Sequence, residues 1–316
     1  MTALTDAEVR PSQPGPETRV AQPAPPPEPA QRGLFAQLPA TIRDIWSHRE
    51  LVFQLTLRDV RIRYKQAIMG FGWAIFMPVL IIGSGLLVRL SMAQMSGREL
   101  LSVVVAGMAI KALPWAFFAG AVGFATPSLV SNANLVTKIA FPREVLPVSA
   151  VLAQTFDSLI GTTVLLILLP FLGVVPTVTA LWAPVIAVLL FLFTVAVCLL
   201  LSCGNLFFRD VKYIVQVILT FGIFFTPVLY EPEHLGPRGT QLIMLNPLSP
   251  LLEGLRLSVV QGHNLLTPLT AVSKTGVVFT TWDPWYLGYS AACAIGGVFI
   301  AALVFHRLES LFAERV

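Results

Sequence analysis

Long stretches without charged side chains dominate the hydropathy pattern of this chain. A membrane-spanning helix needs roughly 20 apolar residues, and six windows with one charge or none approach that length. They cover about residues 72–88, 103–129, 145–169, 181–206, 213–230 and 285–305. Pro170, Gly173, Pro176 and Pro184 divide the longest uncharged interval, as helix-breaking residues do. The pattern predicts an all-α polytopic membrane protein with six transmembrane helices.

Composition supports a bilayer environment. Hydrophobic residues make up 55% of the chain and charged residues only 12%, which is about half the share usual in a soluble domain. Such a chain cannot cover several helices with water-compatible faces, so the class of soluble globular proteins is excluded.

The distribution of Lys and Arg predicts the orientation in the membrane. With six spans, fifteen of the 21 basic residues fall on the side that holds both termini, five fall on the other side, and Lys111 lies within a span. Positive loops are retained in the cytoplasm. We therefore expect a multi-pass protein of the cytoplasmic (inner) membrane with both termini cytoplasmic.

The region before the first span divides into three parts. Residues 1–31 are rich in Pro and polar residues, which predicts a disordered cytoplasmic tail before a transmembrane domain at 32–316. Apolar residues at helical spacing from Leu34 to Trp46 predict an amphipathic helix at the membrane interface. No signal peptide is expected, so the first span serves as the uncleaved signal.

A charged cluster separates this stripe from the first span. It contains Arg58, Asp59, Arg61, Arg63, Tyr64 and Lys65. Two interpretations are open: a topological anchor only, held against anionic headgroups, or an anchor preceded by a helix that lies in the interface plane with its apolar side toward the membrane. Membrane lipids are partners in both.

Two charges inside the predicted spans need an explanation, because a charge at membrane depth is costly. Lys111 lies near the start of its span, which favours a side chain that extends to the outer interface. Asp157 lies nearer mid-span and requires a partner such as Thr, Asn or a facing Lys. Glu253 and Arg256 are three residues apart, at a spacing where an ion pair is plausible on a helix.

Candidate chemistry is sparse. The four histidines are scattered, and Cys198, Cys203 and Cys293 all lie in predicted spans, so neither a metal site nor a disulfide framework nor a catalytic residue is predicted. The sequence contains no Gly-x-x-x-x-Gly-Lys-Ser/Thr phosphate loop. We expect no cofactor and no ATPase site in this chain, and nothing indicates a nucleic-acid partner.

Aromatic residues gather at the ends of three predicted spans. Such rings stack on the C–H faces of sugars and let a chain slide, which suits a conduit for a glycan; the alternative is an ordinary aromatic belt at headgroup level. The candidate path residues are Phe117, Phe118 and Tyr230, followed by Trp73 and Phe76.

Five stretches, in order, resemble one family. They are LTLRDVRIRYKQAIMGFGWAIFMPVL, TKIAFPREVLPVSAVL, LFFRDVKYIVQVILTFGIFFTPVLY, LNPLSPLLEGLRLSVVQG and FHRLESLFAERV. The ordered set resembles the membrane subunit of type-2 ABC exporters, in the branch that exports O-antigen, capsule or teichoic acid. The segment between the fifth and sixth spans is somewhat longer than that pattern.

The resemblance implies a homodimeric permease bound to two copies of a separate ATPase subunit, with an undecaprenyl-linked polysaccharide as substrate. It also implies short re-entrant helices between spans five and six, and a coupling helix within residues 131–143 that contacts the ATPase. The implied coupling residues are Lys138, Phe141, Pro142, Arg143, Glu144, Arg209 and Asp210; for the last two, a simple tight turn is the alternative.

Two other functions remain open. An exporter of drugs or small lipids would share the topology. An integral-membrane glycan transferase would need a His or acidic pair at a membrane face, and no such constellation stands out.

Overall fold

The computed structural model describes residue 43, residues 46–65, isolated residues between 72 and 94, and residues 102–138, 141–272 and 276–315. The predicted tail, nearly all of the apolar stripe before Trp46 and most of the first predicted span lie outside these residues. Helix α2 (Arg49–Tyr64) holds the charged cluster except Lys65, which directly follows it, and packs along α7.

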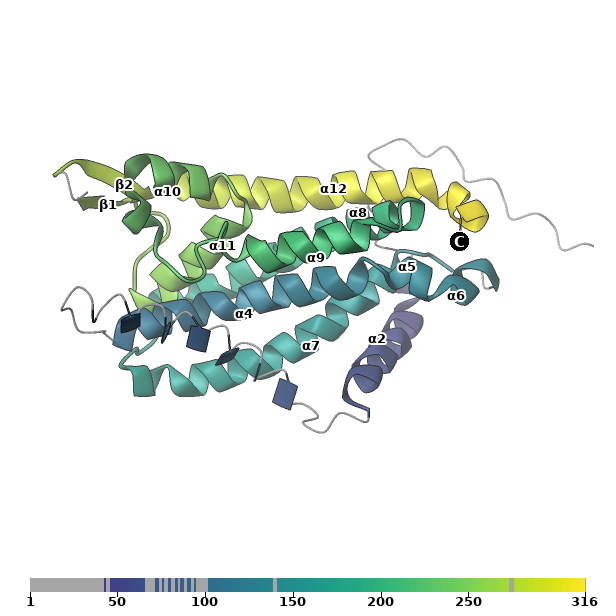
Figure 1. Cartoon of the computed structure of the whole chain (residues 1–316), viewed down its shortest axis with the longest axis horizontal. Coiled ribbons are helices and arrows are strands. Elements are labelled where there is room, and N and C mark those ends of the chain that lie inside the picture. The colour runs from purple at the N-terminus through teal and green to yellow at the C-terminus, as the bar shows by residue number, and fades with distance from the viewer. Residues whose placement is uncertain are drawn as a thin grey trace, which may run out of the picture. The chain divides into compact units, whose positions relative to one another are not determined.

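Four described helices are long and apolar enough to cross a membrane. They are α4 (Ser102–Ala125), α7 (Val145–Leu168), α8 (Trp182–Phe207) and α12 (Pro284–Arg315). They correspond to the second, third, fourth and sixth predicted spans, and helix α8 contacts both α4 and α12 (Figure 1). At about 1.5 Å per residue, each exceeds the roughly 30 Å of a hydrocarbon core.

The connections between these helices follow their turn residues. Gly173 has a φ of 77°, a left-handed conformation that glycine adopts easily, and it ends the 3-10 turn η2 (Pro170–Leu172). Turn η3 (Val178–Leu181) then leads into α8. Between α4 and α7 lie two short helices, α5 (Ser128–Ser131) and α6 (Ala133–Lys138). The helical hairpin expected at the Pro/Gly cluster is therefore present.

The fifth predicted span differs from expectation. Helix α9 (Val211–Gly222) has 12 residues, about 18 Å, and it ends eight residues before the predicted end. Pro227 cannot continue a helix, and the chain turns instead. The count of six spans stays a prediction.

Short elements fill the interval between α9 and α12. They are η4 (Pro232–Leu235), α10 (Gly236–Met244), α11 (Leu248–Leu255) and the π-helix η5 (Arg256–Val260). We call them together the η4–η5 segment. Short helices were expected here, and their depth in the membrane stays a prediction.

A two-stranded antiparallel sheet makes the all-α prediction wrong in one respect. Strand β1 (Leu269–Val272) pairs with β2 (Val278–Trp282), with Thr270 opposite Thr280. β-Branched and aromatic residues favour strands, and Gly276 at a φ of 79° lies between them. The hairpin and α10 lie at the end of the long helices opposite to α5 and α6 (Figure 1).

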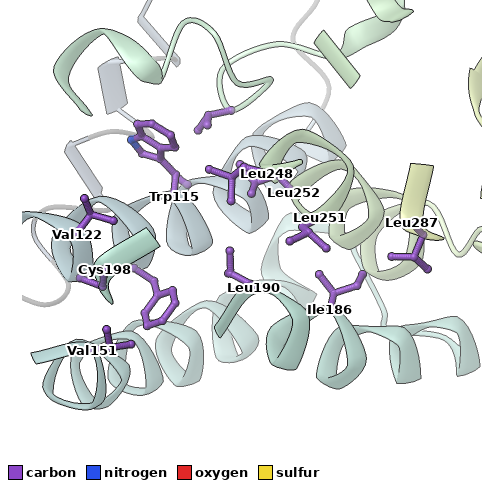
Figure 2. Packing of buried hydrophobic residues seen from close by; sticks show 14 of the residues in the cluster. Trp115, Val122, Val151, Ile186, Leu190, Cys198, Leu248, Leu251, Leu252 and Leu287 are labelled. Carbon is purple, nitrogen blue, oxygen red and sulfur yellow. The ribbon is translucent and has the colours of Figure 1, made fainter. Parts of the chain in front are cut away.

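The largest apolar core lies where α4, α7, α8 and α11 meet. Trp115 of α4 and Leu248 of α11 lie in it together with Leu190 of α8 (Figure 2). Small residues bring helices close: a β-carbon on Gly297 of α12 would lie 3.2 Å from Cβ of Ala196 in α8. In lipid, helix association depends on such close packing.

Candidate functional site

Lys111 of α4 is buried with only 1% of its surface exposed. Its ammonium donates a hydrogen bond to the carbonyl oxygen of Tyr230, at 2.6 Å, and lies 3.6 Å from Oε2 of Glu253. The expectation that it extends to the outer interface is wrong. A carbonyl and a carboxylate from the chain itself replace water, so the side chain does not need to reach the interface.

The predicted pair of Glu253 and Arg256 is confirmed and extends further. Arg256 Nε donates to Glu253 Oε1 at 2.8 Å, its Nη2 contacts the same oxygen, and Glu233 Oε2 lies 3.5 Å away. A β-carbon on Gly107 of α4 would lie 3.3 Å from Arg256 Cδ. Glycine at that position therefore lets the arginine cross the surface of α4.

Burial raises the pKa of the Glu233 carboxyl, and the nearby charge of Arg256 partly offsets this shift. Glu231 precedes it and pairs with His234 at 3.1 Å. Lys111, Glu253, Arg256 and Glu233 form what we call the α4–α11 ion cluster. It ties the η4–η5 segment to α4.

Asp157 of α7 has a partner that the sequence did not suggest. Arg63 Nη1 donates to Asp157 Oδ2 at 2.6 Å and to Gln154 Oε1 at 2.7 Å, and the Tyr64 hydroxyl donates to Asp157 Oδ1. The guanidinium also lies over the ring of Phe124 in α4, 3.8 Å from its centroid. An arginine, not the expected Lys, Thr or Asn, satisfies this carboxylate.

The charged cluster therefore divides into residues that bind α7 and residues that are exposed. Arg63 and Tyr64 point toward α7, whereas Arg61 and Lys65 are exposed. Arg58 pairs with the adjacent Asp59 at 2.9 Å. Arg61 and Lys65 are therefore accessible to headgroups.

The candidate path residues separate into two places. Phe118 stacks near Phe193 of α8, and its ring centroid lies 6.0 Å from that of Trp115. These three rings line a cavity of about 510 Å³ with residues of α9 and α11, which we call the aromatic cavity. Phe117 instead lines a second, apolar cavity of about 550 Å³ between α4, α7 and α8.

Tyr230 does not line the aromatic cavity; its hydroxyl donates to the Phe224 carbonyl at 2.9 Å. Trp73 and Phe76 form an edge-to-face pair with centroids 5.5 Å apart. Sequence reasoning missed the contacts that Gln154 and Phe124 make with Arg63. The three-residue spacing of Gln154 and Asp157 on an apolar helix was the available signal.

The candidate coupling residues differ in accessibility. Lys138 ends α6, and Pro142 and Arg143 lie in the turn before α7, partly buried like Phe141. Glu144, at the start of α7, is buried. Arg209 and Asp210 are exposed in the turn between α8 and α9. Their contact with an ATPase stays a prediction.

Residues 50–260 match the family described as ABC-2 type transporter. The chain belongs to this family. The matched region begins in α2 and ends with η5, so it includes both the Arg63–Asp157 site and the α4–α11 ion cluster. It ends before the β1–β2 hairpin and α12.

Individual proteins are also similar to this chain. An O-antigen export system permease protein of Myxococcus xanthus is 29% identical over 241 residues, which cover 75% of this chain and 91% of that protein. A protein of the same description from Klebsiella pneumoniae is 25% identical over 266 residues, covering 84% and 94%. Together with its apolar helices, this makes the chain a multi-pass membrane subunit of a transporter.

Proposed function

We propose that this chain is the permease of an ABC exporter that moves a lipid-linked cell-surface polysaccharide across the cytoplasmic membrane. The observation that carries this proposal is the match to two proteins described as O-antigen export permeases, along nine-tenths or more of their length. An undecaprenyl-linked glycan of the O-antigen, capsule or teichoic-acid class is the proposed substrate.

The aromatic cavity supports a glycan as cargo. Pockets lined by aromatic side chains bind through ring faces with few polar contacts, and a sugar chain can slide along such faces. Trp115, Phe118 and Phe193 supply three rings from two helices, and the Phe118 ring centroid lies 6.0 Å from each of the other two. Trp115 is held by close packing, because a β-carbon on Gly222 would lie 2.8 Å from its ring.

The energy source lies in another subunit in this proposal. The sequence has no phosphate loop, and the family implies an ATPase subunit as partner. We propose a homodimer with two ATPase copies that contact the α5–α6 connection and the turn at Arg209. Both connections are then cytoplasmic, and the η4–η5 segment is external.

A complementation experiment tests the function. The chain and its partner ATPase subunit are expressed together in a strain that makes lipid-linked O-antigen but lacks its own permease. We expect O-antigen on intact cells by antibody labelling, and none when the ATPase carries a phosphate-loop Lys→Ala change.

Intracellular lipid-linked glycan with no surface signal, despite an assembled complex, would contradict the proposal. The apolar cavity beside Phe117 favours a small amphiphile as the alternative cargo. Stimulation of the ATPase by small lipids or drugs, and not by lipid-linked glycan, would support that alternative.

A further inference from the structure

The ion cluster and the aromatic cavity lie on one face of α4. Lys111, Trp115 and Phe118 are spaced four and three residues apart, so they follow one another along the same side of the helix. Trp115 and Phe118 line the cavity, and Lys111 lies one turn toward the end that carries the η4–η5 segment. Lys111 is not itself part of the cavity lining; it lies one helical turn beyond Trp115 on the same side of α4.

Lys111 contacts the two chain segments that build the wall at this end. Its hydrogen bond to Tyr230 holds the segment after α9, whose Phe225 and Thr226 line the cavity. Its charge faces Glu253 of α11, and Leu248 at the other end of the same helix also lines the cavity. One side chain therefore fixes both segments.

Helix α11 transmits this constraint as a short rigid element. Leu248 and Glu253 are less than two turns apart, about 8 Å along the axis. Arg256 strengthens the attachment, because it binds Glu253 while crossing α4 at Gly107. A shift of α11 away from α4, which would widen the cavity at Leu248, would also separate the Glu253 carboxylate from Lys111.

The strength of the contact between Lys111 and Glu253 depends on whether water reaches it. Two opposite unit charges near 4 Å attract about four times more strongly at an effective dielectric of 20 than in bulk water. The pair therefore holds while dry and weakens once water enters. Such a contact favours two states, closed or open, over a continuous range.

We propose that Lys111, with Glu253 and Arg256, is an ionic latch that closes the η4–η5 end of the aromatic cavity, and that ATP-driven movement opens it. Lys111 acts here as a positioning residue for the cavity wall and not as a contact for the cargo. The inference rests on the proposed export function for its biological meaning, but the latch itself is measurable without cargo.

Thiol labelling measures the closure directly. Thr226 lines the cavity, is buried at 1% exposure, and is similar in size to cysteine. Thr226→Cys is introduced in the complex with the ATPase, in lipid nanodiscs where a charged maleimide reaches both faces. We expect slow labelling of the otherwise unchanged protein and at least a threefold increase with ATP.

Lys111→Met should accelerate labelling at position 226 at least tenfold without ATP and remove the response to ATP. Lys111→Arg, which keeps the charge, should restore both. Arg63→Met is the matched control, because it breaks a buried ion pair that does not contact α11. Labelling of buried Cys198 reports general loosening and should not change.

If Lys111→Met fails to assemble with the ATPase, Glu253→Gln takes its place with the same expectation, since it removes the opposite charge at nearly constant volume. Unchanged labelling at position 226 in the assembled variant would overturn the latch. Equal acceleration by Arg63→Met would do the same. Because no glycan is present, a failure here is distinct from a failure of the complementation experiment, which tests the cargo.

Discussion

Asp157→Asn should lower the free energy of unfolding by more than a typical substitution of an exposed residue does. Asp157 follows Val145 by twelve residues, which places it about 18 Å along α7, near the middle of a hydrocarbon core of roughly 30 Å. Its side chain is 10% exposed and that of Arg63 is 13% exposed. Asp157→Asn leaves the guanidinium at this depth without its carboxylate.

Breaking a buried pair by removing one partner costs about 3–5 kcal/mol. We take the lower value, about 3 kcal/mol, because Gln154 still accepts from Arg63 and Tyr64 can still donate to the amide oxygen introduced at position 157. This corresponds to roughly a hundredfold change in the folding equilibrium. Reversible unfolding in mixed SDS micelles, followed by tryptophan fluorescence, measures the difference.

The double variant Arg63→Met/Asp157→Asn identifies the cause. If the cost comes from the stranded charge, then removing that charge should recover at least about 1 kcal/mol relative to Asp157→Asn alone. A single variant within about 1 kcal/mol of the unchanged protein would refute the reasoning. A double variant no more stable than the single would refute it as well.

Three further predictions concern topology, coupling and pH. A cysteine in place of Lys138 should resist an impermeant thiol reagent in intact cells, whereas one in place of Arg238 should react; the reverse would overturn the orientation. Arg143→Ala should lower ATPase stimulation in the complex about tenfold, as the loss of a charge-assisted contact of about 1.5–3 kcal/mol implies. Arg143 is changed alone because Glu144 is buried, and normal stimulation would show that Arg143 has no role in coupling. Burial raises the pKa of Glu233 above its ordinary 4.5, so the folded state holds this proton to higher pH than the unfolded chain, and the free energy of unfolding should fall as pH rises from about 4.5 through the folded pKa. Unfolding midpoints measured across pH should lose this pH dependence in Glu233→Gln, and an identical pH dependence in that variant would contradict the assignment.

The sequence predicted those features that the bilayer imposes locally. A fixed hydrocarbon thickness requires long apolar runs, so four of the predicted windows coincide with α4, α7, α8 and α12, although α12 continues ten residues past its window, to Arg315. The pair of Glu253 and Arg256 was also accessible, because three residues on a helix place two side chains on one face.

Contacts between distant segments were not predictable. Lys111 binds a carbonyl 119 residues away, and Arg63 binds a carboxylate 94 residues away. No spacing rule in the sequence identifies such pairs. The sequence alone therefore favoured the ordinary behaviour of a long cationic side chain for Lys111, which is to extend to the membrane interface. The contacts of Lys111 with Tyr230 and Glu253 keep it buried instead.

Two departures of the structure from expectation had local signals in the sequence. The uncharged run at 213–230 predicted a complete span, although Pro227 within it indicates an earlier end. The hairpin was signalled by β-branched residues on both sides of Gly276. In a chain with so much apolar sequence, periodicity alone did not separate two short strands from a loop.

The two buried charge sites answer the same physical problem. Lipid tails are as apolar as leucine, so hydrophobic burial does not decide which face of a segment meets the spanning helices. An ammonium or a carboxylate inside a span does decide it, because only a partner of opposite charge or a carbonyl satisfies it at low cost. Asp157 takes its partner from α2, and Lys111 takes its partners from Tyr230 and α11. Neither α2 nor α11 is one of the long spanning helices, so these charges fix the position of segments that apolar packing would leave free to slide.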